Sequence, residues 1–282
     1  MPELPEVETL VRRLREPAIG RTITHTTVLW QRTIGQPAPD EFTRQLRGLM
    51  ITAINRRAKY LVFELTPRPV TKRRAHPAEP THFLLIHLKM SGKLSVVDAG
   101  TPIEKHDRVI FDLDNGQQLR FNDVRKFGRM HLVPHFDVVT GAHGPEPLSD
   151  EFTLKRFREM IRNRSGAIKP LLLNQQFLSG VGNIYADESL WYAKIHPLRT
   201  ASSLKDAEIA ALYRSIRRVL KQAIDDQGTD AGDGVIEGDY QPRIYGREGR
   251  PCYRCHRPIH KTVVGQRGTH FCPTCQPKRG KS

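Results

Sequence analysis

The hydrophobic pattern divides the chain into a first part with strand character and a second part with helical character. Residues 3–16 predict an amphipathic helix, because apolar residues recur there at positions i, i+3, i+4 and i+7. Pro2 and Pro5 fall in its first turn, where a missing N–H costs little. Strand-like runs then continue to residue 123, namely ITHTTVLW, ITAINRRAKYLVFEL, THFLLIHLKMSGKLSVV, RVIFDLD and QQLRFND. The Asp-Asn-Gly at 114–116 predicts a tight hairpin between the last two runs.

Helical periodicity dominates beyond residue 150. Four helices are predicted, at 154–161, 168–178, 184–194 and 204–224. Two segments predict mobile loops: the Pro-rich, basic stretch 66–80 and the Gly- and Asp-rich stretch 227–242. We therefore expect an α+β multidomain protein with a helix plus β-rich domain (1–135), a linker (136–150), a helical domain (151–242), a cysteine module (243–277) and a basic tail (278–282).

All four cysteines of the chain lie near its end, with the spacing C-x2-C-x16-C-x2-C. This spacing allows two thiolate pairs to converge on a tetrahedral zinc ion. Two disulfides are the alternative, which a reducing cytosol disfavours. Four thiolates leave no open coordination position, so the predicted zinc is structural, with the ligands Cys252, Cys255, Cys272 and Cys275.

Composition suits a globular protein, with 38% hydrophobic and 27% charged residues among 282. No stretch approaches the roughly 20 apolar residues of a membrane span. The start MPELPEVETL is acidic where a signal peptide would be basic and then apolar, so we expect a cytoplasmic protein.

The charge points to a polyanionic partner. Lys and Arg outnumber Asp and Glu by 45 to 30, which gives a formal net charge of +15. The excess is concentrated at the end, because Tyr240–Ser282 holds ten basic residues and one acid, Glu248. No amphipathic membrane-surface helix accompanies this charge, so we expect nucleic acid rather than a membrane.

The N-terminus carries the unusual candidate chemistry. Removal of Met1 would leave Pro2 with a free secondary amine, and an α-amino group has a pKa of about 8 against about 10.4 for lysine. Such an amine can attack a sugar C1′ and form a cationic iminium. Glu3 is placed to shuttle a proton beside it. The pattern alone favours the plainer alternative for the glutamates, in which Glu3 and Glu6 stabilise the helix dipole, and it leaves Pro2 open as an ordinary helix-start proline.

Ordered motifs along nearly the whole chain resemble the formamidopyrimidine-DNA glycosylases, bacterial enzymes that excise oxidised purines such as 8-oxoguanine. The start PELPEVET resembles this family rather than the PEGPE start of the related endonuclease VIII group. The other motifs are RRAKYL, HLKMSGKL, EKHD, NDVRKFG, GPEPLSDEF, AIKPLLL, GVGNIYADE, the HP at 196–197, YGREGRPCYRCHRPI and GQRGTHFCPTCQ. The resemblance implies a two-layered β-sandwich, a helix-two-turn-helix domain and a zinc-finger β-hairpin, with DNA bound in the cleft.

The resemblance also implies roles in catalysis. Pro2 would be the Schiff-base nucleophile, and Glu3 its acid–base partner. Lys59 would assist β-elimination, and Arg267, at the tip of the zinc hairpin, would bind phosphate and serve δ-elimination. Without the resemblance, Lys59 would be a solvated lysine at a strand end and Arg267 one basic residue among ten.

Three further residues match those that fill the void left by a flipped base, Met90, Arg125 and Phe127. On sequence alone, Met90 and Phe127 would be core residues. Arg125 would also offer donors to the orphaned base, with a preference for cytosine. Positions that match residues that touch or organise DNA phosphates are His87, His106, Arg164, Lys169 and Asn183, although a lone histidine is usually structural. The turn at 180–183 is predicted to cradle a phosphate with its N–H groups.

Four departures from the family pattern stand out. Val124 replaces a common proline, which predicts a looser loop before Arg125. Arg257 replaces a small residue, and 66–80 is an insert that could add a phosphate contact. The lesion-capping loop reads QGTDAGDGVIEGDY where the family usually begins GGTT or GGSS, so the lesion preference stays open.

We therefore expect a monomeric, bifunctional DNA glycosylase and AP lyase that acts on oxidised purines in damaged double-stranded DNA by β,δ-elimination. It would hold one structural zinc and work in the bacterial cytoplasm, associated with the nucleoid. One alternative keeps this chemistry but takes oxidised pyrimidines or hydantoins. The other is a non-catalytic damaged-DNA-binding protein on the same scaffold.

Overall fold

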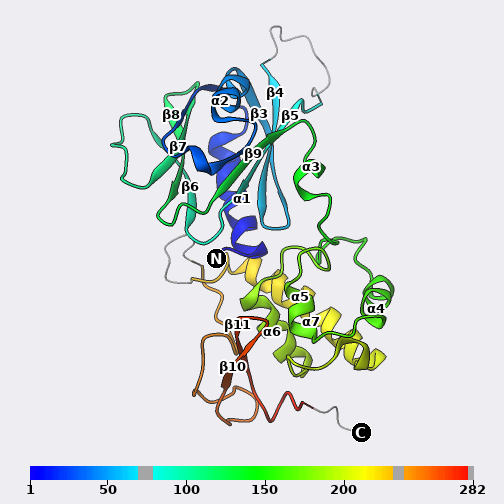
Figure 1. The fold of residues 1–282 in the computed structure, drawn as a ribbon. Helices are drawn as coiled ribbons and strands as arrows, with labels where there is room; N and C mark the ends of the chain where they lie inside the picture. Colours follow the sequence, from blue (N-terminus) through cyan, green and yellow to red (C-terminus); the bar gives the residue numbers. More distant parts are fainter. Residues whose placement is uncertain (69–78, 231–237, 279–282) are drawn as a thin grey trace. The chain divides into compact units, whose positions relative to one another are not determined.

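The computed structural model describes residues 1–68, 79–230 and 238–278, which group into two compact units (Figure 1). The first unit contains Met1–Pro2 and Glu6–Ala142, and the second contains Glu3–Pro5, His143–Thr229 and the chain from Gly238. The division after Ala142 falls inside the predicted linker, which also contains the short helix α3 (Asp137–Thr140). Most of the two expected mobile loops, 69–78 and 231–237, lies outside the described residues.

Two sheets form the first unit. The five-stranded sheet has the order β2 (Ile34–Gln36), β9 (Arg129–Val133), β5 (His82–His87), β4 (Tyr60–Pro67) and β3 (Leu49–Arg57). The four-stranded sheet has the order β1 (Ile23–Val28), β7 (Asp107–Leu113), β8 (Gln117–Asp123) and β6 (Gly92–Asp98). All neighbouring strands are antiparallel except β2 and β9. The predicted hairpin joins β7 to β8, with Gly116 at a φ of +79°.

Two of the long apolar runs each contain two strands rather than one. The chain reverses at Ala58, which has a φ of +54°, and again around Lys89, which has a φ of +55°. The sequence pattern also missed β2, β9, α3 and the helix α2 (Pro39–Leu46). These elements are too short to show a clear apolar period. Their apolar side chains pack against residues from distant parts of the chain.

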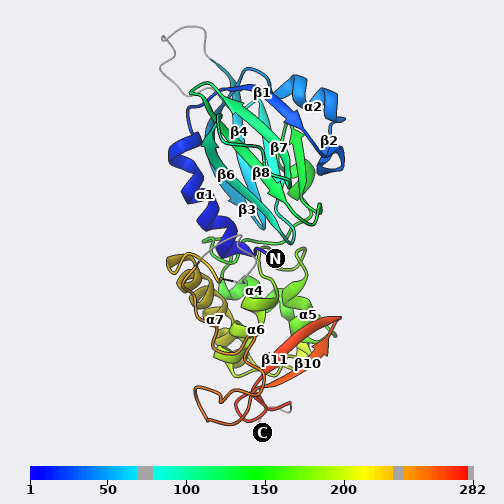
Figure 2. The same ribbon diagram turned by 90° about the vertical axis from the view of Figure 1, so that its left-hand side faces the viewer.

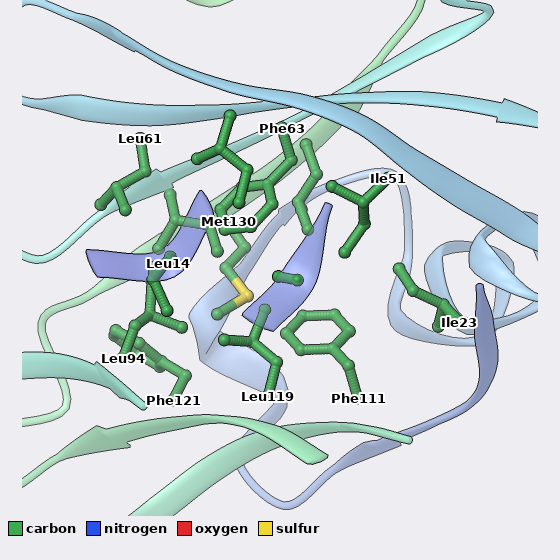
Figure 3. Close-up of a cluster of buried hydrophobic side chains, with 14 of the residues drawn as sticks. Leu14, Ile23, Ile51, Leu61, Phe63, Leu94, Phe111, Leu119, Phe121 and Met130 are labelled. Carbon is green, nitrogen blue, oxygen red and sulfur yellow. The ribbon is translucent and has the colours of Figure 1, made fainter. Parts of the chain in front are cut away.

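A single apolar core fills the space between the two sheets (Figure 3). Phe111 and Phe121 from the four-stranded sheet face Phe63 and Met130 from the five-stranded sheet. The helix α1 (Leu4–Ala18) contributes its periodic apolar face to the same core, through Val7, Leu10, Val11, Leu14 and Ala18. The amphipathic pattern of the N-terminal residues therefore corresponds to the burial of one face of α1 in this core.

Three connections cross from one sheet to the other at the same end of the sandwich. They are residues 29–33, which include the 3-10 turn η1 (Gln31–Thr33), residues 88–91 and residues 124–128. Strand pairing brings their ends together, because His87 lies opposite Arg129 in one sheet and Gly92 lies opposite Asp123 in the other. Loops distant in sequence are therefore neighbours at this end.

The second unit consists of helices and a β-hairpin (Figure 2). Its helices are α4 (Leu154–Arg162), α5 (Ile168–Leu173), α6 (Asn183–Ala193) and α7 (Asp206–Asp225), with the 3-10 turn η2 (Ala201–Ser203) between the last two. The prediction placed the end of α5 at residue 178, but the helix ends at Leu173. The hairpin consists of β10 (His260–Val264) and β11 (Arg267–Phe271).

Truncation of a core aromatic tests the sandwich. Phe111→Ala should lower the free energy of unfolding by about 3–5 kcal/mol, because the ring is fully buried and leaves a cavity. Chemical denaturation followed by circular dichroism measures the loss. Phe127→Ala is the matched control, and since its side chain is 48% exposed it should change stability by less than about 0.5 kcal/mol. Equal losses in the two variants would contradict this assignment of the core.

Candidate DNA-binding and catalytic site

The four cysteine sulfurs come together as the spacing predicted. All four lie within 4.8 Å of one another, with Cys255 and Cys272 sulfurs 3.4 Å apart and Cys252 and Cys275 sulfurs 4.0 Å apart. Sulfurs at about 2.3 Å from a tetrahedral zinc ion would be separated by about 3.8 Å, so the donor set fits zinc. No cysteine pair forms a disulfide. The predicted structural zinc site is confirmed in its ligands.

Hydrogen-bond donors surround the first of these thiols. The indole Nε1 of Trp191 donates to the Cys252 sulfur at 3.4 Å. Burial raises the pKa of the Cys252 thiol, but the backbone N–H groups of Arg254 and Cys255 and the indole outweigh it and lower the pKa to about 6. A thiolate is the form that binds a metal, so α6 helps to prepare the ligand.

A buried carboxylate on α6 organises the start of the zinc module. Glu188 accepts hydrogen bonds from the backbone N–H groups of Arg243, Ile244 and Tyr245 at 2.8–2.9 Å. Burial raises the pKa of Glu188, and these three donors oppose the rise. The module is therefore attached to the helical unit by polar contacts as well as by its apolar residues.

A second buried network holds the β10–β11 hairpin. Lys169 on α5 and Asp187 on α6 are fully buried and form an ion pair of 2.6 Å. The Lys169 ammonium also donates to the carbonyl of Gly268 and the hydroxyl of Thr269. Asn183 donates to the same Gly268 carbonyl at 3.0 Å. These contacts hold Gly268, the residue that follows Arg267. The side chain of Arg267 itself is exposed.

This network narrows the interpretation of Lys169. The resemblance predicted that Lys169 touches or organises a DNA phosphate, and the second role fits a side chain that has no exposed surface and an ammonium that is occupied within the protein. Burial lowers the pKa of Lys169, and the Asp187 carboxylate opposes that shift. The geometry fits a residue that positions the backbone next to Arg267.

The carboxylate of Glu3 caps helix α6. Its oxygens accept hydrogen bonds from the N–H groups of Ile184 at 3.0 Å and Tyr185 at 3.4 Å. A Cβ at Gly182 would lie 2.3 Å from the Glu3 carboxyl carbon, so only glycine permits this approach. Since Gly180 N–H donates to the Gln175 side chain, part of the turn predicted to cradle a phosphate is occupied by the protein's own acceptors.

The end of the sandwich where the three crossings lie gathers the predicted site residues of the first unit. Lys59 lies in the turn between β3 and β4, and His87 ends β5 with its ring 4.7 Å from that of Tyr60. Lys59 is only 6% exposed, so it is not a solvated strand-end lysine. The His87 Nδ1 accepts the backbone N–H of Lys89, which places the proton of the neutral ring on Nε2.

The proposed void-filling residues are on the surface of this same end. Phe127 is 48% exposed and Met90 is half-buried, so neither belongs to the core. The guanidinium of Arg125 lies over the Phe127 ring at 4.9 Å. The expectation that Met90 and Phe127 are core residues, which the sequence alone favoured, is therefore wrong.

Two other predicted phosphate contacts lie in different units. His106 directly precedes β7 in the first unit, and its carbonyl accepts the N–H of Asp123 at 2.9 Å. Its ring Nδ1 lies 3.1 Å from the Arg108 guanidinium, which fits an acceptor nitrogen. Arg164, in the second unit, is exposed after α4, with its guanidinium 5.8 Å from the Phe177 ring.

Family models match three parts of the chain in this order. They are the formamidopyrimidine-DNA glycosylase N-terminal domain at residues 1–130, the H2TH domain of the same glycosylase at 143–233, and the zinc finger found in FPG and IleRS at 249–278. The chain belongs to the formamidopyrimidine-DNA glycosylase family. The α+β fold with its sandwich, helix-two-turn-helix unit and zinc hairpin is thereby confirmed.

Relatives and solved structures match this chain along nearly its full length. Formamidopyrimidine-DNA glycosylases of Herpetosiphon aurantiacus and Enterococcus faecalis are each 44% identical, over 98% and 100% of this chain and 100% and 99% of their own. A structure of MutM in complex with DNA that contains carbocyclic 8-oxo-G is 38% identical, with a TM-score of 0.88. Lactococcus lactis FPG in complex with a FAPY-dG DNA is 36% identical, also with a TM-score of 0.88. Each covers 98% of this chain, which covers 100% of each solved chain.

Several residues that shape the site were not found from the sequence. Asp187 and Glu188 are buried and accept hydrogen bonds that position the zinc module, and Ser91 and Asp123 hold loops of the first unit. Val124 was expected to loosen its loop, but the carboxylate of Asp123 fixes the loop through the N–H groups of the residues at 125 and 128. An aspartate at a strand end before a turn is a usable signal for such a bond.

In the part of the chain that the structure describes, no helix has the length and apolar character to cross a bilayer.

Loss of a cysteine ligand tests the zinc site. Cys272→Ser should reduce bound zinc from about one ion per chain to nearly none, because structural zinc sites require their full ligand set. Elemental analysis measures the metal, and duplex-DNA binding should weaken while the sandwich unit keeps its cooperative unfolding. Thr274→Ser, an exposed change between two ligands, is the control that should keep the metal.

The buried ion pair gives a stability prediction. Lys169→Met should destabilise the helical unit by about 3–5 kcal/mol, because it leaves the Asp187 carboxylate buried without its cation. Lys155→Met, on the exposed face of α4, is the matched control and should be close to neutral. Thermal unfolding distinguishes the two variants. A small effect at Lys169 would show that Asp187 finds water or another donor.

Proposed function

We propose that this protein excises oxidised purines from duplex DNA and then cleaves the abasic strand, with the Pro2 nitrogen as nucleophile. The observation that carries the proposal is the fixed position of Glu3, whose carboxylate is held at the N-terminus of α6 directly after Pro2. A carboxylate at the site of the amine is what proton transfer during iminium formation requires. The 44% identity to named glycosylases along the whole chain supports the same activity.

The reaction proceeds in four steps. The secondary amine of Pro2, free once Met1 is removed, attacks the sugar C1′ while the damaged base leaves with a proton. Loss of the amine proton and opening of the sugar ring give a cationic iminium. The iminium accepts the electron pair of the C2′–H bond, and the 3′ phosphate leaves. A second elimination removes the proton of C4′ and expels the 5′ phosphate, so the gap carries phosphate at both ends, and water hydrolyses the remaining iminium to free the Pro2 amine.

Basic residues of both units would bind the phosphates of the DNA backbone. Lys59, low in exposure at the turn after β3, would place its charge near the reacting sugar and 3′ phosphate. Arg267 would bind phosphate from the hairpin tip and assist the second elimination. Lys169 would act indirectly by fixing the backbone beside Arg267. The residues that would contact phosphates elsewhere are His87, His106, Arg164 and Asn183.

Met90, Arg125 and Phe127 would fill the space left by the everted base. Their exposure and the stacking of Arg125 on Phe127 support this role. Arg125 would donate to the orphaned base, which favours cytosine opposite the lesion. The protein would act as a monomer on damaged double-stranded DNA, in the bacterial cytoplasm where the nucleoid lies.

Oxidised purines are the first expected substrates, because solved relatives hold 8-oxo-G and FAPY-dG DNA. Oxidised pyrimidines are the second candidate, since one complex of the Lactococcus lactis protein contains an oxidised-pyrimidine DNA. Excision rates on a panel of duplexes with each lesion and each opposite base distinguish the two.

Covalent trapping tests the nucleophile. Borohydride should reduce the iminium and link the protein to 8-oxoguanine DNA, which gel electrophoresis detects. A two-residue extension that stays attached before Pro2 converts its nitrogen to an amide, and should lower trapping by at least about a hundredfold, as expected for loss of a covalent nucleophile. The same extension at the C-terminus is the control. Equal trapping by both extended proteins would rule out Pro2.

A further inference from the structure

One buried carboxylate joins the two loops that carry Met90, Arg125 and Phe127. Asp123, the last residue of β8, has no exposed surface. Its Oδ1 accepts the hydroxyl of Ser91 at 2.6 Å, and its Oδ2 accepts the N–H of Gly128 at 2.7 Å. The loop 124–128 is therefore held at both of its ends by a single side chain.

The Ser91 hydroxyl completes the link between the loops. It donates to Asp123 and accepts the backbone N–H of Arg125 at 3.1 Å, and the same N–H lies 3.2 Å from Asp123 Oδ1. A serine hydroxyl can donate once and accept twice, so both bonds form together. Ser91 follows Met90 directly. The backbone beside Met90 and the backbone of Arg125 are therefore both linked to the Asp123 carboxylate.

The backbone of both loops packs closely on one side chain of the core. A Cβ at Gly92 would lie 2.8 Å from the Phe121 ring, and one at Gly128 would lie 2.3 Å from the same ring. Both loops thus rest on one core aromatic, which is fully buried between the sheets. The hydrogen bonds join the loops to each other, and the close approach to this ring admits only glycine at positions 92 and 128.

The third crossing at this end is tied to the same residue. Arg108 donates from Nε to the Asp123 carbonyl at 2.8 Å, and its own carbonyl accepts the N–H groups of Leu29 and Trp30. The ammonium of Lys126 lies 4.1 Å from the centre of the Trp30 ring. All three loops between the sheets therefore meet around Asp123.

We propose that Ser91 and Asp123 are positioning residues that fix Met90, Arg125 and Phe127 as one preformed wedge. The proposal rests on the void-filling role given above to these three residues. Separating stacked base pairs costs a few kcal/mol, and ordering two loose loops at the same time would add to that cost. A wedge already assembled in the free protein avoids the second cost.

The chemistry of the link requires an aspartate. Its three bonds all come from donors, two N–H groups and one hydroxyl, and a carboxylate accepts all of them. Asparagine cannot take its place without conflict, because Asp123→Asn would turn one NH2 group toward another donor. The Ser91→Ala change removes only the bridge between the loops and leaves the Gly128 bond intact.

Stopped-flow fluorescence with 2-aminopurine next to 8-oxoguanine in a duplex follows insertion of the wedge. Ser91→Ala and Asp123→Asn should slow insertion by up to about tenfold, as expected for the loss of one hydrogen bond. They should also reduce the preference for cytosine over adenine opposite the lesion, because Arg125 loses its fixed backbone. Ser91→Thr, which keeps the hydroxyl, should restore both. Ser95→Ala, on the exposed face of β6, is the control and should match the wild type.

Cleavage of a single-stranded abasic oligonucleotide separates this role from general damage. No base pair is opened there, so Ser91→Ala should cleave it at the wild-type rate. An equal loss on both substrates would overturn the proposal. If Asp123→Asn fails to fold, the Ser91→Ala and Ser91→Thr pair decides alone.

Met90→Ala and Phe127→Ala, measured in the same assay, test the void-filling role itself. If both slow insertion while Ser91→Ala does not, the link between the loops is unimportant and the positioning proposal is wrong. If neither slows insertion, the void-filling role fails, and the positioning proposal fails with it.

Discussion

The crossing of the chain between two sheets at one end of the sandwich is the constraint on which the first unit depends. A two-layered sandwich must close its layers with connections, and the backbone polar groups of these connections need partners. Here three crossings, at 29–33, 88–91 and 124–128, meet around Asp123, through its carboxylate and through the arginine that binds its carbonyl. The loops that would enter DNA are consequently held by hydrogen bonds to one buried residue of this unit.

The second unit solves a similar problem with buried charge. An ion pair without exposed surface is costly to bury and stabilises only when further hydrogen bonds satisfy both groups. In addition to their ion pair, the Lys169 ammonium donates to Gly268 and Thr269, and the Asp187 carboxylate accepts the N–H of His270. The network selects one position of the hairpin relative to α5 and α6, and so one position for the backbone of the residue at 267.

Helix α6 has a central place in the second unit. Its first N–H groups bind the Glu3 carboxylate, its middle carries Asp187 and Glu188, and its last turn presents Trp191 to the Cys252 sulfur. The helix is buried almost throughout, which leaves little periodicity in its sequence. The proposed catalytic carboxylate, the hairpin and the metal site therefore depend on one short element.

Elements with local or covalent signals were predictable from the sequence. The zinc ligands followed from cysteine spacing, α1 and α7 from their apolar periodicity, and the β7–β8 hairpin from Asp-Asn-Gly. The family resemblance supplied roles that no spacing shows, as for Lys59 and Arg267. Features that depend on burial and on partners distant in the chain became visible in the folded protein. It placed Phe127 on the surface, enclosed Lys169, and brought Ser91 to Asp123 across 32 positions, because strand pairing rather than sequence order makes these residues neighbours.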